Sequence, residues 1–555
     1  MSTPNPTIRK KESSFLVPTD NAKQLFKVIY QDESKKAETG DEVPKINVSS
    51  VISKMSFYYE KIRNSVDYEE EHLHRKNAIK RIVKRLIVIE GKIVIKELKT
   101  ADIAKHLMVE LIRAGYLPNN KIPETKIDEV EKIIDKYLKL KDFSLEGLKI
   151  TLNDKNDLVD WIMAMTASEI EEKLGRSRVD MAVVSYMDQV LTDRIAFPDD
   201  SPYSADKDIQ VILGIYRNFL KFDDEMLSFL LLKHYYPNWT NPSEGDIEEV
   251  AKGIFHLQEN IQAQINHPFV AQFNRIINRY TVFFSVLIEV IKEDPVKVYE
   301  SFQNDPTAFS RKIKAACNQK YKVAGKKKWR VSVRSIVYIF ITKSVFAFAL
   351  EVPATKWLGE ELNLFSLLVN IAFPPALLFL IVLFTMIPGS DNTNKIVEGI
   401  EDIVFDGDKK KEPFKLRKPA KRNKTLGTVF GLIYAFTFCI SFGLVVWVLD
   451  KLNFSWLSII IFIFFLALIS FFSIKVRKTA RELLIVEKKE SLLSFLIDFF
   501  YVPIIEVGRW LSERFSKINV FVFILDFIIE APFKIFVEIA EEWTRYVKER
   551  KDDIT

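Results

Sequence analysis

Three stretches of this chain contain no charged residue, and each is long enough to cross a lipid bilayer. They are residues 362–388, 426–449 and 452–474. About 20 apolar residues span the hydrocarbon core of a bilayer. Only Asp450 and Lys451 separate the last two stretches, so these two must form a tight antiparallel hairpin. The chain is therefore predicted to be an integral membrane protein.

A fourth apolar run, residues 335–350, is shorter and contains Lys343. Basic clusters decide whether it crosses the membrane. They lie at 326–334, at 475–481 and in 409–424, which has nine Lys and Arg residues against one Glu. Four crossings place all three clusters on one side, as the positive-inside rule requires, whereas three crossings do not.

The sequence thus predicts spans near 335–350, 364–387, 426–449 and 453–474, within a transmembrane domain of residues 331–475. Both termini are expected to be cytoplasmic, in a cell (inner or plasma) membrane. The basic residues expected to contact lipid headgroups are Lys326, Lys327, Lys328, Arg330, Arg334, Lys475, Arg477 and Lys478.

Small residues recur at every fourth position of the third span, on one helix face: Gly427, Gly431, Ala435, Cys439 and Gly443. Such a face lets two helices approach closely in a membrane. The favoured interpretation is packing against the hairpin partner within one molecule, and the alternative is a homodimer seam. In the second span, Pro374 and Pro375 predict a kink, because proline removes a helical hydrogen bond.

Lys343 is the strongest candidate for a functional residue. A charge inside a membrane span is energetically costly and needs a partner or a water-filled cavity. One hypothesis is an ion or substrate pathway lined by Lys343. The favoured alternative is a shallow span in which Lys343 reaches the headgroups or pairs with a carboxylate of the tail, such as Asp526 or Glu530.

The part before the spans reads as soluble. Residues 1–48 mix Pro, Ser, Thr and charges and are expected to be disordered, with no cleavable signal peptide. Residues 49–330 show apolar residues at helical spacing and are expected to form a cytoplasmic domain of some ten helices. The predicted helix signals are a start at Thr100, a helix from Asn153 to Gly175, a Ser243–Asp246 capping box, and starts at Pro295 and Pro306.

Residues 476–555 form an apolar tail with narrow polar stripes, such as Asp526, Glu530, Lys534 and Glu538 at four-residue spacing. This pattern predicts amphipathic helices on the cytoplasmic face of the bundle, partly in the headgroup layer. The fold class expected for the whole chain is all-α: a multi-helix cytoplasmic domain, a four-helix transmembrane bundle of two hairpins, and amphipathic C-terminal helices.

One resemblance accompanies this pattern. The run SKINVFVFILDFIIEAPF at residues 516–533 resembles the tail of a group of multi-pass membrane proteins of candidate-phylum bacteria, and DIQVILGIYRNFL at residues 208–220 is similar to a segment of the same group. The resemblance covers about a tenth of the chain and contains no chemical motif. It implies a bacterial inner-membrane protein without an assigned activity.

No motif in the sequence predicts catalysis. Phosphate-binding glycine loops, a Gly-x-Ser-x-Gly elbow and a His-Glu-x-x-His motif are all missing. Glu69-x-x-His72 and Glu71-x-x-His74 match half of a di-metal motif, but both fall in one charged stretch, 69–76, which is interpreted as a solvated helix surface. Neither a metal nor another cofactor is expected, and the chain is not expected to be an enzyme.

The charge balance limits the partners. Lys and Arg total 80 against 74 Asp and Glu, for a net charge of +6, which argues against nucleic-acid binding. The two cysteines, Cys317 and Cys439, cannot form a disulfide framework. The first hypothesis is a membrane-anchored scaffold or interaction protein that contacts lipids and binds a protein partner through residues 49–330. The alternative is an oligomeric channel or transporter with its pathway near Lys343.

Overall fold

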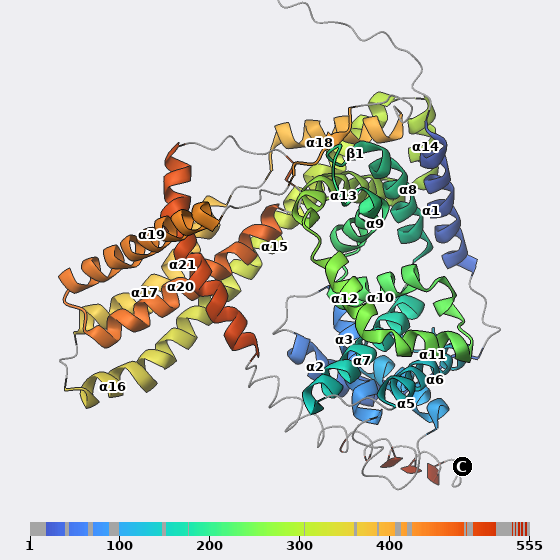
Figure 1. The fold of residues 1–555 in the computed structure, drawn as a ribbon, viewed down its shortest axis with the longest axis horizontal. Helices are drawn as coiled ribbons and strands as arrows, with labels where there is room; N and C mark the ends of the chain where they lie inside the picture. The colour runs from blue at the N-terminus through green and yellow to red at the C-terminus, as the bar shows by residue number, and fades with distance from the viewer. Residues whose placement is uncertain are drawn as a thin grey trace, which may run out of the picture. The chain divides into compact units, whose positions relative to one another are not determined.

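The computed structural model describes residues 18–38, 44–64, 70–87, 99–146, 151–175, 177–304, 306–359, 363–385, 388–405, 412–418, 424–481, 484–485 and 492–517, with single residues between 536 and 551. Across these residues the chain is all-α, as predicted (Figure 1). One short parallel pair, β1 (Ile195–Ala196) with β2 (Phe414–Lys415), is the exception within the described part.

The chain divides into two units, described separately below. The helical unit comprises residues 20–281, 410–418 and 520–555, and the membrane unit comprises residues 1–19, 282–409 and 419–519. Helix α13 (Val270–Glu293) passes from one to the other. The change of unit occurs near residue 281, whereas the sequence placed the domain boundary at residue 330.

The other helices of the helical unit follow one another through short loops. They are α1 (Asp20–Glu38), α2 (Ser50–Asn64), α3 (Glu71–Arg85), α5 (Thr100–Arg113), α6 (Thr125–Leu145), α7 (Leu152–Gly175), α8 (Arg178–Arg194), α9 (Lys207–Asn218), α10 (Asp224–Tyr235), α11 (Glu244–Lys252) and α12 (Ile254–Ile265), with 3₁₀ turns η2 (Ser204–Asp206) and η3 (Pro237–Thr240). The predicted helix over 153–175 and the start at Thr100 are confirmed. So is the Ser243–Asp246 capping box.

Helix α3 joins its neighbours through buried cations. Arg75 makes a two-pronged ion pair with Glu171 of α7 at 2.6 and 2.7 Å, and Lys76, only 1% exposed, contacts Asp223 and Glu225. Farther along the helix, Lys80 binds Asp160 and Glu225, Arg81 binds Glu60, and Arg85 binds Glu110. The expectation that the 69–76 stretch is a solvated surface is therefore wrong for residues 73 and 76, which are buried.

The prediction of disorder over residues 1–48 is wrong for residues 20–38. These residues form α1, and Ala22, Leu25, Phe26 and Ile29 are each at most 4% exposed. Their spacing of three and four is that of one helix face, which packs against α8. Residues 1–17 lie outside the described part of the chain.

The membrane unit contains four helices long and apolar enough to cross a membrane, as predicted (Figure 1). The first is the end of α15 (Pro306–Phe346), continued by a π-helical turn, η4 (Ala347–Glu351), and by α16 (Val352–Trp357). The others are α17 (Leu364–Phe384), α19 (Lys424–Lys451) and α20 (Trp456–Arg481), with α14 (Pro295–Asn304), α18 (Ser390–Val404) and α21 (Leu492–Lys517) around them.

Helix α15 is far longer than its predicted span. Its 41 residues make a rod of about 60 Å at 1.5 Å per residue. Helix α18, which the sequence analysis did not predict, packs on the first half of this rod. There the Tyr321 hydroxyl lies 2.9 Å from the amide nitrogen of Asn392, and Ser310 binds Glu401. The predicted starts at Pro295 and Pro306 are confirmed.

Helix α21 packs on α19 and α20 of the bundle, and the expected position of the tail on the cytoplasmic face stays a prediction. The Ser441 hydroxyl of α19 donates to the carbonyl of Phe500 at 2.8 Å, and Gly508 packs against the backbone of Ala467 in α20. Ser441 and Ala467 lie about 15 Å along their helices from the α19–α20 connection, near the middle of a 30 Å hydrocarbon layer. Helix α21 thus packs on the bundle at mid-span. Residues 518–535, which include Asp526 and Glu530, are outside the described part.

The α20–α21 contact gives a test of this packing. A Cβ added at Gly508 would overlap the carbonyl oxygen of Ala467, whereas a Cβ at Gly431 of α19 would meet nothing within 4 Å. Gly508→Ala should therefore destabilise the protein by about 1–3 kcal/mol through overpacking. Gly431→Ala, the matched control, should be neutral or slightly stabilising, because alanine favours the helix. Thermal unfolding of both variants in detergent checks this, and equal melting temperatures would contradict the α21 position.

Candidate functional site

Lys343 and Glu351 form an ion pair inside the membrane unit. Their side chains are 0% and 2% exposed, and Lys343 Nζ lies 3.7 Å from Glu351 Oε2. In a regular α-helix, residues eight apart are rotated by about 80° from one another. The π-helical turn η4 lies between them and takes up one extra residue, so that both lie on the same face, two turns apart.

Two neighbouring helices complete this polar cluster. Asn370 of α17 donates to Glu351 Oε1 at 2.6 Å, and the Ser458 hydroxyl of α20 donates to the same oxygen at 3.0 Å. Lys343 Nζ lies 4.1 Å from the centre of the Phe465 ring of α20, a cation–π contact. The cluster therefore connects the first, second and fourth spans.

The cluster leaves three buried polar atoms without a hydrogen-bond partner: Lys343 Nζ, Glu351 Oε2 and Asn370 Oδ1. A small cavity of about 10 Å³, roughly the room that one water molecule needs, lies beside Glu351. Its other lining residues are Thr355, Asn363, Ser366, Leu367, Ser455 and Ser458. Asn363 and Ser455 directly precede α17 and α20, so the cavity lies toward that end of the bundle.

The expectation that Lys343 sits shallow and reaches the headgroups is not what the structure shows. Lys343 is fully buried and paired with a carboxylate of its own span. The sequence interpretation ended this span at residue 350, one position before Glu351, and so looked for the partner in the tail. The spacing of eight residues was no signal, because a regular helix places two such residues on different faces.

Within the described part of the chain, the small-residue face of α19 packs on no other helix, contrary to the favoured interpretation. Gly431, Ala435, Cys439 and Gly443 are exposed, and a Cβ at Gly427 would meet nothing within 4 Å. Helix α19 instead buries Thr437, Ser441 and Leu449. The homodimer alternative stays a prediction.

The basic residues near the spans have different roles. Lys326, Lys327, Arg330 and Arg334 of α15 are exposed, in keeping with a headgroup contact. Lys328 instead places its ammonium 2.9 Å from the carbonyl of Thr385 and 3.3 Å from that of Val382, and so caps the end of α17. Arg477 is half-buried, and the side chains of Lys475 and Lys478 lie outside the described part.

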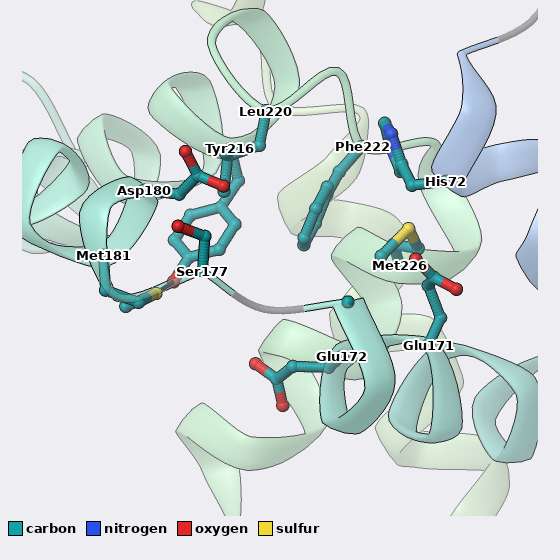
Figure 2. Close-up of a pocket in the computed structure, with 11 residues that line it drawn as sticks. His72, Glu171, Glu172, Ser177, Asp180, Met181, Tyr216, Leu220, Phe222 and Met226 are labelled. Atoms are coloured by element: carbon teal, nitrogen blue, oxygen red, sulfur yellow. Dashed lines mark hydrogen bonds between the residues drawn. The ribbon is translucent and has the colours of Figure 1, made fainter. Parts of the chain in front are cut away.

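The helical unit contains a pocket of about 130 Å³ (Figure 2). Five helices and the turn before α10 build it: His72 comes from α3, Glu171 and Glu172 from α7, Asp180 and Met181 from α8, Tyr216 from α9, and Met226 from α10. Gly175, Ser177, Leu220 and Phe222 complete the lining. Figure 2 shows the rings of Tyr216 and Phe222 between the two carboxylates of α7 and the Asp180 carboxylate of α8.

Charges around this pocket are partly neutralised. Arg75 binds Glu171, and Lys233 binds both oxygens of Glu172 at 2.6 and 2.7 Å. Asp180 adds a third carboxylate. Burial lowers the pKa of His72, so the ring is neutral at pH 7. The floor is apolar and contains Met181 and Met226, whose flexible side chains adapt to differently shaped ligands.

The sequence did not predict this pocket, because its residues come from positions 72–226 with no fixed spacing. His72 was singled out only as half of a metal motif. Among the described residues, no three His, Cys, Asp or Glu side chains are grouped so as to hold a metal ion.

Comparison with known proteins gives no relative. No family model matches the chain, and neither the curated proteins nor the solved structures contain a match.

The buried pair predicts a strong response to mutation. Lys343→Met leaves the Glu351 carboxylate without its cation, which should destabilise the protein by about 3–5 kcal/mol. The double variant Lys343→Met/Glu351→Gln should recover much of this loss, because no charge is left unpaired. Thermal unfolding in nanodiscs measures both. Lys356→Met, at an exposed lysine of the same span, is the control. Equal effects of the two single lysine changes would mean that Lys343 is not paired.

His72 predicts a pH dependence in the helical unit. Its pKa is lowered by burial, so below about pH 6.5 the unfolded state takes up a proton before the folded state does. Stability should therefore fall as the pH drops from 7 through 6.5, and hydrogen exchange of α3 should become faster. His72→Gln should reduce this acid response. His256→Gln, at an exposed position, should not change it.

Proposed function

We propose that this protein is a membrane-anchored interaction protein, in which the bundle holds the chain in a cell membrane and the helical unit binds a protein partner. The observation that carries this proposal is the pocket of the helical unit, which is lined by two methionines, two aromatic rings and three carboxylates (Figure 2). The basic clusters flanking the spans favour a cytoplasmic position for both termini.

The chemistry of the pocket indicates which side chain it accepts. Three carboxylates line it; Glu171 is paired with Arg75, and Glu172 is paired with Lys233. Tyr216 and Phe222 offer ring faces, and the two methionines offer adaptable apolar contact. A lysine or arginine side chain has the apolar stem and cationic end that such a site binds. The partner is therefore expected to insert a basic side chain.

The interior of the bundle favours anchoring over conduction. Phe454, Phe462, Leu466 and Ala467 form one buried cluster with residues of α21 packed on it, and Leu378, Val382 and Ile469 form another. Side chains therefore fill the described space between α15, α17 and α20 in a single copy. This packing supports the anchoring role over the alternative channel near Lys343.

Photo-crosslinking tests the proposal in cells. A photoreactive phenylalanine analogue at Leu220, in the pocket, should capture one protein partner, and mass spectrometry should place the crosslink beside a Lys or Arg of that partner. The same analogue at Leu152, which is 74% exposed and not part of the pocket lining, is the matched control. Leu220→Trp, which fills the pocket, should abolish binding of the identified partner without changing membrane insertion.

A different result would reject the proposal. Equal crosslinking at Leu220 and Leu152 would show that the pocket is not a binding site. Solute or ion flux in liposomes containing the full chain, lost on Lys343→Met but not on Leu220→Trp, would favour the transporter alternative.

A further inference from the structure

The polar cluster in the membrane unit has features that a purely structural ion pair does not need. The two oxygens of Glu351 differ: Oε1 accepts from Asn370 and Ser458, while Oε2 accepts from no described group. Lys343 Nζ, at 3.7 Å, is too far from Oε2 for a hydrogen bond. One oxygen is therefore held in place, and the other is free to take a proton.

The backbone around the cluster is irregular on two helices. The π-helical turn η4 ends at Glu351, and such turns in α-helices are frequent at functional sites. On α17, Pro374 has no amide hydrogen for the carbonyl of Asn370, four residues earlier. Both irregularities cost stability and occur at the residues that hold the carboxylate.

The cavity beside Glu351 gives a polar approach from one end of the bundle. Thr355, Ser366 and Ser458 line it with hydroxyl groups. On the other side of Lys343, Ile339, Leu378, Val382 and Ile469 pack together, and the buried residues there also include Ser332, Ser335, Ser470 and Ser473. The cavity beside Glu351 lies at the opposite end, where Asn363 precedes α17 and Ser455 precedes α20.

The charges around the cavity determine which cation it can bind. In the described residues at this interface, Lys343 and Glu351 are the only charged groups; Lys328, Lys356 and Arg477 lie toward the ends of the helices, and Glu506 and Arg509 are exposed on α21. A metal cation would add a second positive charge beside the ammonium with one carboxylate to balance both. A proton needs no further ligand and bonds directly to the carboxylate.

We propose that the cavity of Thr355, Ser366 and Ser458 leads to a proton-binding site at Glu351 Oε2, reached from the membrane face where α16–α17 and α19–α20 connect. A hydronium ion entering the cavity gives its proton to Oε2, which forms an O–H bond and releases water. The carboxylate becomes neutral, and Lys343 loses its counter-ion. Protonation thereby weakens the polar contacts that connect the first, second and fourth spans.

Infrared difference spectroscopy of the full chain in nanodiscs tests the site. Lowering the pH should produce the carbonyl band of a protonated carboxyl group, and this band should be lost in Glu351→Gln and kept in Glu506→Gln, at an exposed carboxylate of α21. A band that survives Glu351→Gln overturns the proposal.

The cavity has its own test, which does not require removing either charge. Ser366→Leu fills the approach to Glu351, so that after a pH jump the band should rise several-fold more slowly to the same final size. Ser344→Leu, at a half-buried serine of α15 outside the cavity lining, should leave the rate unchanged. An unchanged rate in Ser366→Leu, or the absence of any titrating band before the protein unfolds, would show that the cavity is not a proton path.

Discussion

A charged pair inside a lipid bilayer sets the conditions that the membrane unit must meet. Water cannot solvate Lys343 or Glu351 at that depth, so each must find its compensation within the protein. Glu351 obtains it from α15, α17 and α20 at once, through the Lys343 ammonium, Asn370 and Ser458. Because the hydrophobic effect does not hold helices together in lipid, this polar joint and close backbone contacts such as Gly508 against Ala467 must fix the arrangement.

The helical unit also contains buried charges that must be neutralised, but there water can reach their partners. Six cations of helix α3 form ion pairs with its neighbours, and Lys76 is nearly as buried as Lys343. Here, however, Asp223 and Glu225 stay about one-third exposed, so water shares the cost of holding the charge. Such pairs select one arrangement of helices over others. How much each set of ion pairs stabilises its unit thus depends on how much water remains near the carboxylates.

The sequence predicted those features of the fold that depend on long apolar runs or on local helix-capping signals. The four spans follow from apolar length and charge asymmetry, and the starts at Pro295, Pro306 and Ser243 follow from cap chemistry. Predictions failed where the partner is distant in sequence. Helix α18 was missed although Ile396, Ile400 and Val404 mark one face, because that face matters only once α15 is beside it. The small residues of α19 were assigned to an internal seam, but Ser441 selected the opposite face by binding α21.

The intramembrane site could not be predicted for a specific geometric reason. Regular helical geometry separates Lys343 and Glu351 by about 80° of rotation, so a helical wheel places them on different faces. The π-helical turn removes that separation, and nothing in the residues 347–351 identifies it as π-helical. Its stability comes from the contacts it creates: without Asn370 and Ser458 around Glu351, an extra residue in the turn would only weaken the helix. The contacts of the cluster therefore stabilise the π-helical turn. Because those contacts come from α17 and α20, the sequence of α15 alone does not show that Glu351 is the partner of Lys343.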